Sequence, residues 1–349
     1  MLSAPQSVRV RALAATWLTL TAVLASAGAH AADQSACLLR ALSEAADAMT
    51  VGELKALCEP PFVTMESTPV KPSARTASSR RPVYERGALE ERIRNEALLR
   101  DRPWVMTPHQ PNYFLATYFS NPYQAPFAGP AVGNRPLNEQ EAKFQVSFKA
   151  PIWRRMFNRN LDVYVAYSAT SWWQLGNNDL SNPFRETDYE PELFISSYTD
   201  IDLLGLRFAG WTLGIDHESN GRTEPLSRSW NRILGRTSLQ VLDDLTVQLR
   251  AWYRLPEHKK DDDNPGMHRY YGYGDLRAIW TPNKNTFTVM GRPGTDKGAF
   301  EVTWSYPISN VFRVYAQYYN GYGESLIDYD RDIERFGIGV ALNDFLMRQ

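Results

Sequence analysis

An alternation of apolar and polar residues with a period of two constrains the fold of this chain most strongly. Between Lys143 and Ile152, one set of alternate positions is apolar and the other polar, namely Phe144, Val146, Phe148, Ala150 and Ile152 against Lys143, Gln145, Ser147 and Lys149. Because side chains two apart on a β-strand share a face, this run predicts a strand with one apolar and one polar face. Residues 312–318 and 336–342 alternate in the same way.

Runs of strand length recur along most of the chain. They can be drawn at about 109–120, 141–153, 159–170, 189–200, 203–219, 229–240, 244–255, 268–280, 284–293, 297–307, 310–322 and 333–345. Twelve is an even number, as expected of a single-chain bacterial barrel, and lipid leaves an open strand edge without a partner. The sequence therefore predicts an all-β fold, a closed twelve-stranded antiparallel transmembrane β-barrel with a short N-terminal helical and linker extension.

Composition agrees with a barrel better than with a helical membrane protein. Mean hydropathy is negative, and beyond the N-terminal leader no window approaches the ~20 apolar residues that a membrane helix needs. The 10 tryptophans and 18 tyrosines suit the aromatic girdles of transmembrane barrels. The net charge of −1 gives no electrostatic case for binding nucleic acid.

The N-terminus has the pattern of a secretory signal peptide. Arg9 and Arg11 precede an uncharged run, Ala12–Ala29, which ends at Ala29-His30-Ala31. A basic start, an apolar middle and small residues at the end predict cleavage after Ala31 and export, with a retained anchor as the alternative. We therefore divide the chain into a signal peptide at 1–31, an N-terminal segment at 32–100 and a barrel domain at 101–349.

The segment 32–100 combines helical and linker patterns. Cys37 and Cys58 survive cleavage, and in an exported chain they form either one disulfide or two free thiols. Helical spacing follows Cys37 and a capping box precedes Cys58, at Leu38, Leu39, Leu42, Ala46 and Thr50-x-x-Glu53. Residues 59–82 are rich in Pro, Ser and Thr and indicate a flexible linker. Ala88–Arg100 reads as a solvated helix or tail, and the segment as a tether or a plug.

The stretch His217–Arg236 carries the residues of a candidate active site. His217 and Ser219 follow Trp211, Leu213 and Ile215 at alternate positions, so they share the apolar face of a strand. The turn-forming run 220–225 separates this strand from the next. A hairpin folded about Glu224 places Asn231 opposite His217.

This combination suits acyl transfer. A serine hydroxyl attacks, the imidazole takes its proton, and a third group sets the orientation and tautomer of the imidazole. An amide stabilises the imidazolium less than a carboxylate would. The alternative interpretation is a polar loop beside a strand, where His217 and Ser219 occur together by chance and have no catalytic role.

The chain closely resembles the outer membrane phospholipase A family. The hallmark residues are His217 and Ser219, then Asn220-Gly221-Arg222 and Ser227-Arg228-Ser229-Trp230-Asn231-Arg232. Further matches lie at 171–175, 183–187, 189–191 and 321–329, and the resemblance spans roughly Pro108 to Phe345. A likeness this long and dispersed is highly specific.

The resemblance implies a calcium-dependent serine hydrolase on the lipid-facing wall of an outer-membrane barrel. Ser219 would be the nucleophile, His217 the base and Asn231 its orienting partner, with the Gly221 amide at the oxyanion. Calcium would bind the Arg222 carbonyl, the Ser227 hydroxyl and Ser181 of the partner subunit. The implied activity, in a homodimer, is hydrolysis of phospholipid acyl esters at the A1 and A2 positions, and of lysophospholipid.

Three further observations bear on this reading. If the apolar face points outward, the three polar residues face the membrane, where polar groups are costly without a function. The acidic run Asp261-Asp262-Asp263-Asn264, together with Glu224, is either a second calcium site or a solvated loop tip. Ala169 stands where the family's dimer face has a glutamine, so we expect dimer contacts that are weaker or differently packed.

Two rival functions remain. A passive outer-membrane barrel, porin-like or structural, predicts a polar, open lumen and no loss when Ser219 is changed. Pairing of Arg232 and Arg236 across the barrel would close the lumen and favour an enzyme. A soluble exported esterase built as a β-sandwich should stay in solution without detergent.

Overall fold

The computed structural model describes residues 87–347, apart from 101, 103–104, 121, 123–136, 178–183, 204, 259 and 261. The predicted signal peptide, the cysteine pair, the capping box, the linker and Ser181 lie outside the described residues. In the described part of the chain, no helix is long and apolar enough to cross a membrane.

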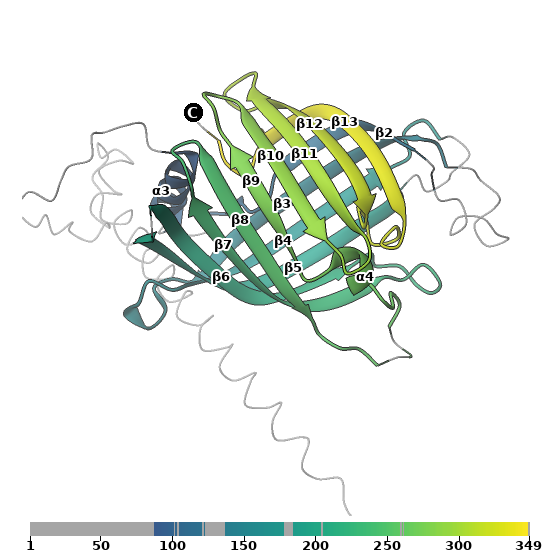
Figure 1. The fold of residues 1–349 in the computed structure, drawn as a ribbon, viewed down its shortest axis with the longest axis horizontal. Coiled ribbons are helices and arrows are strands. Elements are labelled where there is room, and N and C mark those ends of the chain that lie inside the picture. The colour runs from purple at the N-terminus through teal and green to yellow at the C-terminus, as the bar shows by residue number, and fades with distance from the viewer. Residues whose placement is uncertain are drawn as a thin grey trace, which may run out of the picture. The chain divides into compact units, whose positions relative to one another are not determined.

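Twelve long strands form a closed antiparallel barrel, in agreement with the prediction (Figure 1). Each strand pairs with its neighbours in sequence, and β13 returns to pair with β2. The strands are β2 (Asn112–Phe119), β3 (Gln140–Trp153), β4 (Asp162–Trp173), β5 (Phe184–Leu203), β6 (Leu206–Ser219), β7 (Ser229–Gln240), β8 (Leu245–Arg254), β9 (Gly274–Trp280), β10 (Thr286–Pro293), β11 (Gly298–Pro307), β12 (Arg313–Tyr322) and β13 (Asp332–Asn343).

Shorter elements complete the described fold. A two-residue strand, β1 (Thr107–Pro108), pairs with β3, and a 3-10 turn, η2 (Met156–Asn158), lies between β3 and β4. Helix α3 (Ala88–Arg100) precedes the barrel, and helix α4 (His268–Tyr271) lies between β8 and β9. The loops after β2, β4, β6, β8 and β12 are longer than those at the other end, an asymmetry typical of barrels whose long loops are extracellular.

One predicted strand begins too early. Residues 268–273 were expected to open the strand at 268–280, but His268–Tyr271 form helix α4 and β9 starts at Gly274. Gly272 has φ +62°, and a Cβ there would lie 1.9 Å from the Pro293 carbonyl oxygen, so the chain turns sharply into the strand at this glycine. The helix places Tyr271, only 4 % exposed, in an apolar cluster with Trp230 and Trp252. Tertiary packing therefore overrides the alternation here.

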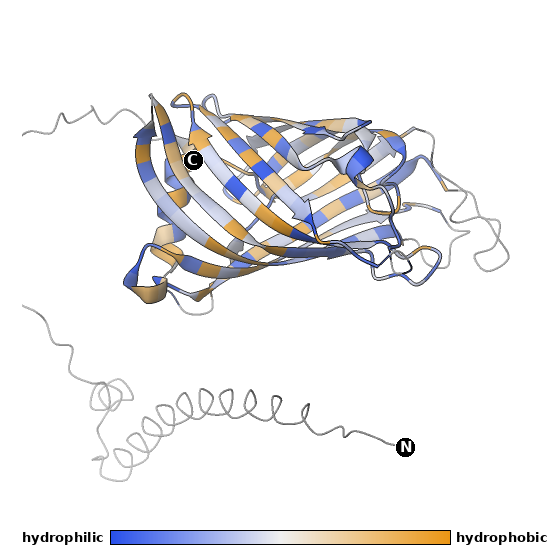
Figure 2. Ribbon diagram, turned by 60° about the horizontal axis from the view of Figure 1, so that its bottom comes forward, coloured by the Kyte–Doolittle hydropathy of each residue, from blue (hydrophilic) through white to orange (hydrophobic). Residues whose placement is uncertain are grey.

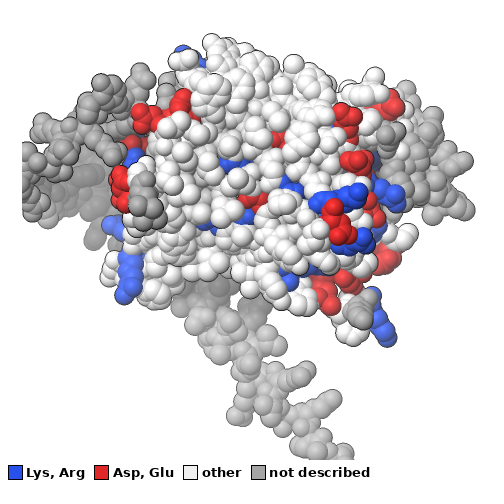
Figure 3. All heavy atoms as spheres, viewed as in Figure 1, with Lys and Arg blue, Asp and Glu red and all other residues white. Residues whose placement is uncertain are grey.

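The wall of the barrel has an apolar outer face and a polar inner face. On β6, Trp211, Leu213 and Ile215 are 37, 52 and 55 % exposed, whereas Asp216 is 4 % exposed. Apolar and polar patches alternate along the strands in Figure 2. Figure 3 shows the wall as largely free of charge, with charged side chains gathered towards the two ends.

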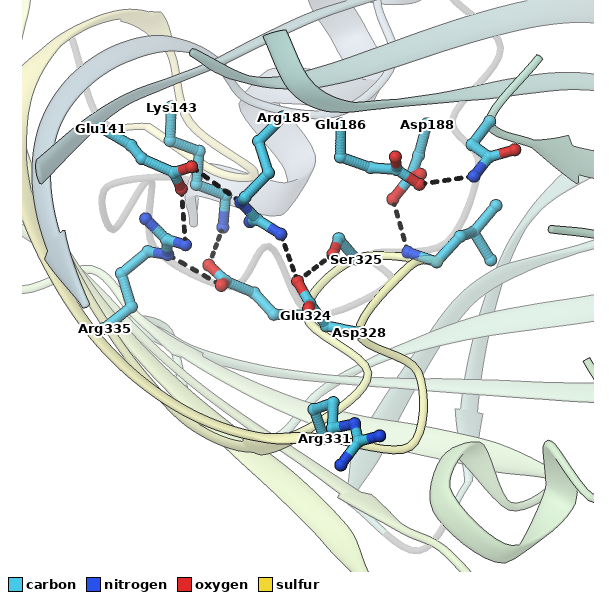
Figure 4. A network of polar contacts seen from close by, with 12 residues as sticks. Glu141, Lys143, Arg185, Glu186, Asp188, Glu324, Ser325, Asp328, Arg331 and Arg335 are labelled. Atoms are coloured by element: carbon cyan, nitrogen blue, oxygen red, sulfur yellow. Dashed lines mark hydrogen bonds and ion pairs between the residues drawn. The ribbon is translucent and has the colours of Figure 1, made fainter. Parts of the chain in front are cut away.

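Ion pairs fill part of the barrel interior. In the described interior, Glu141 binds Arg185 and Arg335, with 2.7 Å from its Oε1 to Arg185 Nε and 2.9 Å from its Oε2 to Arg335 Nη2. Arg185 also contacts Asp328 in the loop after β12. Figure 4 shows these side chains converging with Lys143 and Glu324, which are 3.0 Å apart. Because β5 and the β12–β13 loop are far apart in the sheet, these contacts cross the lumen.

Helix α3 is a helix as predicted, but the prediction that it is solvated is wrong. Ala88 and Leu89 are 2 and 6 % exposed and pack in a cluster that includes Ile279 and Phe345. The Glu96 carboxylate binds Lys149 Nζ at 2.8 Å and accepts a hydrogen bond from the Tyr198 hydroxyl at 2.7 Å. Glu90 and Glu96 thus meet partners on the barrel, whereas Arg94 remains exposed.

Candidate active site

Strands β6 and β7 bring two of the predicted catalytic residues together. His217 pairs with Asn231 in the register of these strands, as the predicted hairpin requires. His217 Nδ1 and Asn231 Oδ1 are 2.9 Å apart, a hydrogen bond in which the protonated Nδ1 donates. The asparagine therefore holds the imidazole in one orientation and favours the tautomer whose Nε2 is free to act as a base.

The site lies on the outer face of the barrel. His217 and Ser219 continue the alternate positions of Leu213 and Ile215, and Asn231 shares its face with Ile233, which is 42 % exposed. The three polar residues are half-buried. Ser219 is the last residue of β6 and lies two residues from His217 on the same face.

Buried side chains support the site from the lumen. Trp230 and Arg232, which flank Asn231, are 1 and 2 % exposed. Arg232 binds both Asp216 and Glu218, the residues that flank His217, at 2.7 and 2.9 Å. These inner contacts hold β6 and β7 in the register that aligns His217 with Asn231.

A structured loop follows Ser219. Asn220 is buried, and its amide donates to a Glu186 carboxylate oxygen and to the Leu226 carbonyl, both at 2.8 Å. Its Oδ1 accepts from the backbone amides of Arg222 and Arg228. Asn220 thus ties the start of the loop to its end.

Gly221 adopts a conformation that suits glycine. Its φ is +63°, and a Cβ there would lie 3.3 Å from the Tyr189 ring. Tyr189 is also the partner of Ser219 in the register of β5 and β6. The Gly221 amide therefore stands two residues after Ser219 in a turn that a larger residue would strain.

Two of the predicted calcium ligands, the Arg222 carbonyl and the Ser227 hydroxyl, belong to the same loop. Ser227 Oγ donates to Asp263 Oδ2 at 2.6 Å, which leaves the lone pairs of the hydroxyl available to a cation. The Arg222 side chain is anchored 3.0 Å from Glu186, so its backbone is held in place. Both predicted calcium ligands among the described residues thus lie in the 220–228 loop.

The acidic run is held by hydrogen bonds and is not a free loop tip. Asp263 also accepts from the Ser229 amide at 2.9 Å, and Asp262 binds Arg254 at 2.7 Å. Asn264 is fully buried. Asp261 lies outside the described residues. These contacts show a structural role for Asp262 and Asp263 at the edge of the site.

A second acidic group was not predicted. Glu190, Glu192 and Asp216 place carboxylate oxygens within 4.8 Å of one another, a grouping that can hold a metal ion. These residues point to the lumen, where Arg232 binds Glu190 and Asp216, and Arg236 binds Glu192. Arg232 and Arg236 pair with carboxylates on β5 and β6, and not across the barrel as the sequence suggested. Arg232 and Arg236 offset part of the negative charge of this cluster.

Glu257 is a site residue that the sequence did not reveal. It lies three residues beyond β8, and its Oε1 accepts a hydrogen bond from Asn231 Nδ2 at 3.2 Å. The register of β7 and β8 pairs Arg232 with Arg254, so a residue just beyond β8 falls level with Asn231. That residue is Leu255, whose amide donates to the Asn231 carbonyl, so the register alone gave no signal for Glu257.

Comparison with known proteins identifies the family. The phospholipase A1 family model matches residues 89–342. A phospholipase A1 of Escherichia coli is 39 % identical over 251 residues, covering 70 % of this chain and 83 % of the relative, and one of Salmonella typhimurium has the same identity and coverage.

Solved structures agree. The outer membrane phospholipase A of Escherichia coli aligns with a TM-score of 0.68 at 36 % identity, covering 75 % of this chain and 99 % of that one. A calcium-bound dimer of the Salmonella typhi outer membrane phospholipase aligns with a TM-score of 0.65 at 36 % identity, covering 70 % of this chain and 94 % of that one. The match of sequence and of the barrel shows that this chain belongs to the phospholipase A1 family.

Proposed function

We propose that this chain is an outer-membrane phospholipase that hydrolyses acyl esters of phospholipids at the A1 and A2 positions, and those of lysophospholipids. The observation that carries the proposal is the 2.9 Å contact between His217 and Asn231 beside Ser219, on the wall that faces lipid. A phospholipid in the membrane meets this wall directly, without entering the lumen.

The geometry supports a serine-hydrolase mechanism. With Nδ1–H held by Asn231, His217 Nε2 accepts the Ser219 proton as the hydroxyl oxygen attacks the ester carbonyl. The carbonyl oxygen becomes an oxyanion, to which the Gly221 amide donates. The imidazolium returns its proton to the leaving alcohol and leaves an acyl-serine. Water, deprotonated by the same imidazole, then attacks the acyl carbon, and the imidazolium returns the proton to Ser219 Oγ as the acyl–serine bond breaks and the fatty acid leaves.

The bridged lumen favours this enzyme over a passive barrel. A porin-like channel needs an open polar passage, whereas Arg185, Asp328 and their partners bridge the lumen between β5 and the β12–β13 loop. An outward-facing His217–Asn231 pair has no use in a channel, and unpaired polar groups facing hydrocarbon are costly.

Calcium fits the oxygen atoms of the 220–228 loop. The Arg222 carbonyl and the Ser227 hydroxyl are neutral oxygen ligands of the kind that calcium accepts, and Asp263 adds negative charge beside Ser227. Calcium bound there supplies positive charge next to the oxyanion. Ser181 of the partner subunit completes the proposed ligand set, so metal binding and homodimer formation depend on each other.

The proposed dimer face includes β4. Ala169 pairs with Val146 and with Tyr189, which are 53 and 39 % exposed on the outer wall. The methyl side chain of Ala169 cannot donate or accept a hydrogen bond across this face. We expect dimers that dissociate more readily than those of relatives with glutamine at this position. Export through the signal peptide at 1–31 is part of the proposal.

Fatty-acid release from phospholipid–detergent micelles tests the function. The intact chain and Ser219→Ala are compared, each with excess calcium and with chelator. We expect release by the intact chain with calcium only, and none by the variant. Release that survives chelation would remove calcium from the mechanism. A folded barrel without any release would instead favour the passive reading.

A further inference from the structure

We infer that Glu257 is a positioning residue of the active site, which acts through Asn231 to fix the orientation of His217. The inference rests on the proposed function. Asn231 makes two side-chain contacts in opposite directions, one from Oδ1 to His217 Nδ1 at 2.9 Å and one from Nδ2 to Glu257 Oε1 at 3.2 Å. His217, Asn231 and Glu257 thus form a chain of three groups, and Ser219 lies two residues from His217 on the same face of β6.

The chemistry of an amide explains why a group beyond Asn231 is needed. The two ends of an asparagine amide have nearly the same size, and a half-turn exchanges its acceptor and donor. With the donor end towards His217, Nδ1 would have to accept, the proton would move to Nε2, and the base that Ser219 needs would be lost. An ionised carboxylate only accepts hydrogen bonds. Glu257 therefore holds the NH₂ end of Asn231 and leaves Oδ1 for the imidazole.

Charge is the second contribution. An aspartate in the orienting position would stabilise the imidazolium with its own negative charge, which asparagine lacks. Glu257 places a carboxylate one side chain further away, and its charge polarises the Asn231 amide so that Oδ1 becomes more negative. The pair Asn231 and Glu257 thereby recovers part of what a carboxylate partner provides.

The loop after β8 is built to hold Glu257 in place. The Leu255 amide donates to the Asn231 carbonyl at 2.8 Å, which joins the start of the loop to β7. Arg254 binds Glu257 Oε2 at 3.2 Å and Asp262 Oδ1 at 2.7 Å, so one guanidinium clamps two points of the loop. The Glu257 side chain is only 18 % exposed. A carboxylate held on both oxygens is an ordered part of the site.

Three variants separate the two contributions. Glu257→Ala removes the acceptor, and we expect kcat to fall about tenfold with KM unchanged, the scale for residues that orient a catalytic group. Glu257→Gln offers either an oxygen or an NH₂ to Asn231, so its kcat should lie between those of Glu257→Ala and the parent. Glu257→Asp should restore part of the activity because it keeps the charge and the acceptor.

The pH profile distinguishes positioning from folding. Without the carboxylate, the imidazolium of the free enzyme is less stabilised, so the acidic limb of kcat/KM should move to lower pH in Glu257→Ala and Glu257→Gln. A merely structural change lowers the rate without moving this limb. Asp296→Asn is the matched control, because Asp296 is an exposed carboxylate in another loop at the same end, paired with Arg269 at 2.6 Å. It should leave rate and profile unchanged.

A double-mutant cycle with Asn231→Ala tests whether Glu257 acts through Asn231. If Glu257 acts through Asn231, its removal has no further effect once the amide is gone, and the double variant should match Asn231→Ala. Equal losses in the parent and in the Asn231→Ala background would overturn the inference, as would a Glu257→Ala variant with unchanged rate and profile. Hydrolysis that survives Ser219→Ala overturns the proposed function itself, so the two failures are distinguishable.

Discussion

Replacing Glu141 with glutamine should destabilise the barrel strongly. The Glu141 side chain is completely buried and accepts hydrogen bonds from three donors: Arg185 Nε at 2.7 Å, Gln174 Nε2 at 2.7 Å and Arg335 Nη2 at 2.9 Å. Glutamine has nearly the same shape, but it lacks the charge and turns one of the two oxygens into a donor. That donor faces at least one arginine donor, so a buried guanidinium loses one of its two carboxylate partners.

The magnitude follows from these contacts. Each hydrogen bond to a charged group contributes about 1.5–3 kcal/mol. Removing one member of a buried ion pair costs about 3–5 kcal/mol, because the charge left behind has no compensation. Arg335 keeps Glu324 at 2.7 Å, and Arg185 keeps Asp328, so the loss should not exceed this range. We expect Glu141→Gln to lower the free energy of unfolding by about 3–5 kcal/mol.

Unfolding in guanidinium chloride, followed by tryptophan fluorescence of the barrel in lipid vesicles, measures this loss. Glu334→Gln is the control, because Glu334 is an exposed carboxylate on β13 that accepts one hydrogen bond from Tyr318 at 2.7 Å. Its effect should be below about 1 kcal/mol. A loss below about 1 kcal/mol for Glu141→Gln as well would refute the view that the lumen network holds the barrel together.

Two other predictions concern the site loop and the lumen. Gly221→Ala should lower kcat by roughly 10²-fold, which is the scale for the displacement of one oxyanion donor. The φ of +63° at Gly221 and the Tyr189 ring, 3.3 Å from an added Cβ, both oppose a side chain there. An unchanged kcat in micelle assays would show that the Gly221 amide takes no part in catalysis. Burial alone would raise the pKa of Glu324, but Arg335 and Lys143 outweigh it and lower that pKa to about 2. Its ion pairs therefore stabilise the fold at neutral pH, and unfolding midpoints should fall as the pH drops from about 4.5 towards 2, less so in Glu324→Gln.

The alternation of residues was enough to predict the barrel. Strands such as β3 and β13 lie within a few residues of their predicted bounds, because an alternating run has one arrangement that turns its apolar side chains to lipid. The alternation misled at 268–273, where Tyr271 packs into a lumen cluster as part of helix α4. It also gave no sign that helix α3 docks. The charges of α3 are matched by lumen partners such as Lys149, which only the closed barrel brings near.

The same reasoning separates the predictable part of the site from the rest. The three proposed catalytic residues, His217, Ser219 and Asn231, lie on two strands joined by a short loop. The period-two alternation of the strands and the position of the turn between them are therefore enough to place these residues on one face. Glu257 lies in a loop without periodicity, and its 3.2 Å contact depends on how that loop folds back over β7. Contacts between a strand and a long loop are set by tertiary packing, which a local pattern does not contain.

In a barrel wall, neighbouring residues of one strand point alternately to the lumen and to the outer face. This alternation links the lumen contacts to the active site on the outer face. His217 points outward between Asp216 and Glu218, which point inward, and Asn231 lies in the same way between Trp230 and Arg232. The inward residues bind one another: Arg232 with Asp216 and Glu218, and the Trp230 indole with Glu218 at 2.8 Å. A shift of one residue between β6 and β7 would break all of these contacts and would separate His217 from Asn231. The charged side chains inside the barrel therefore hold β6 and β7 in the register on which chemistry at the lipid face depends. A channel would not require this role of its lumen charges.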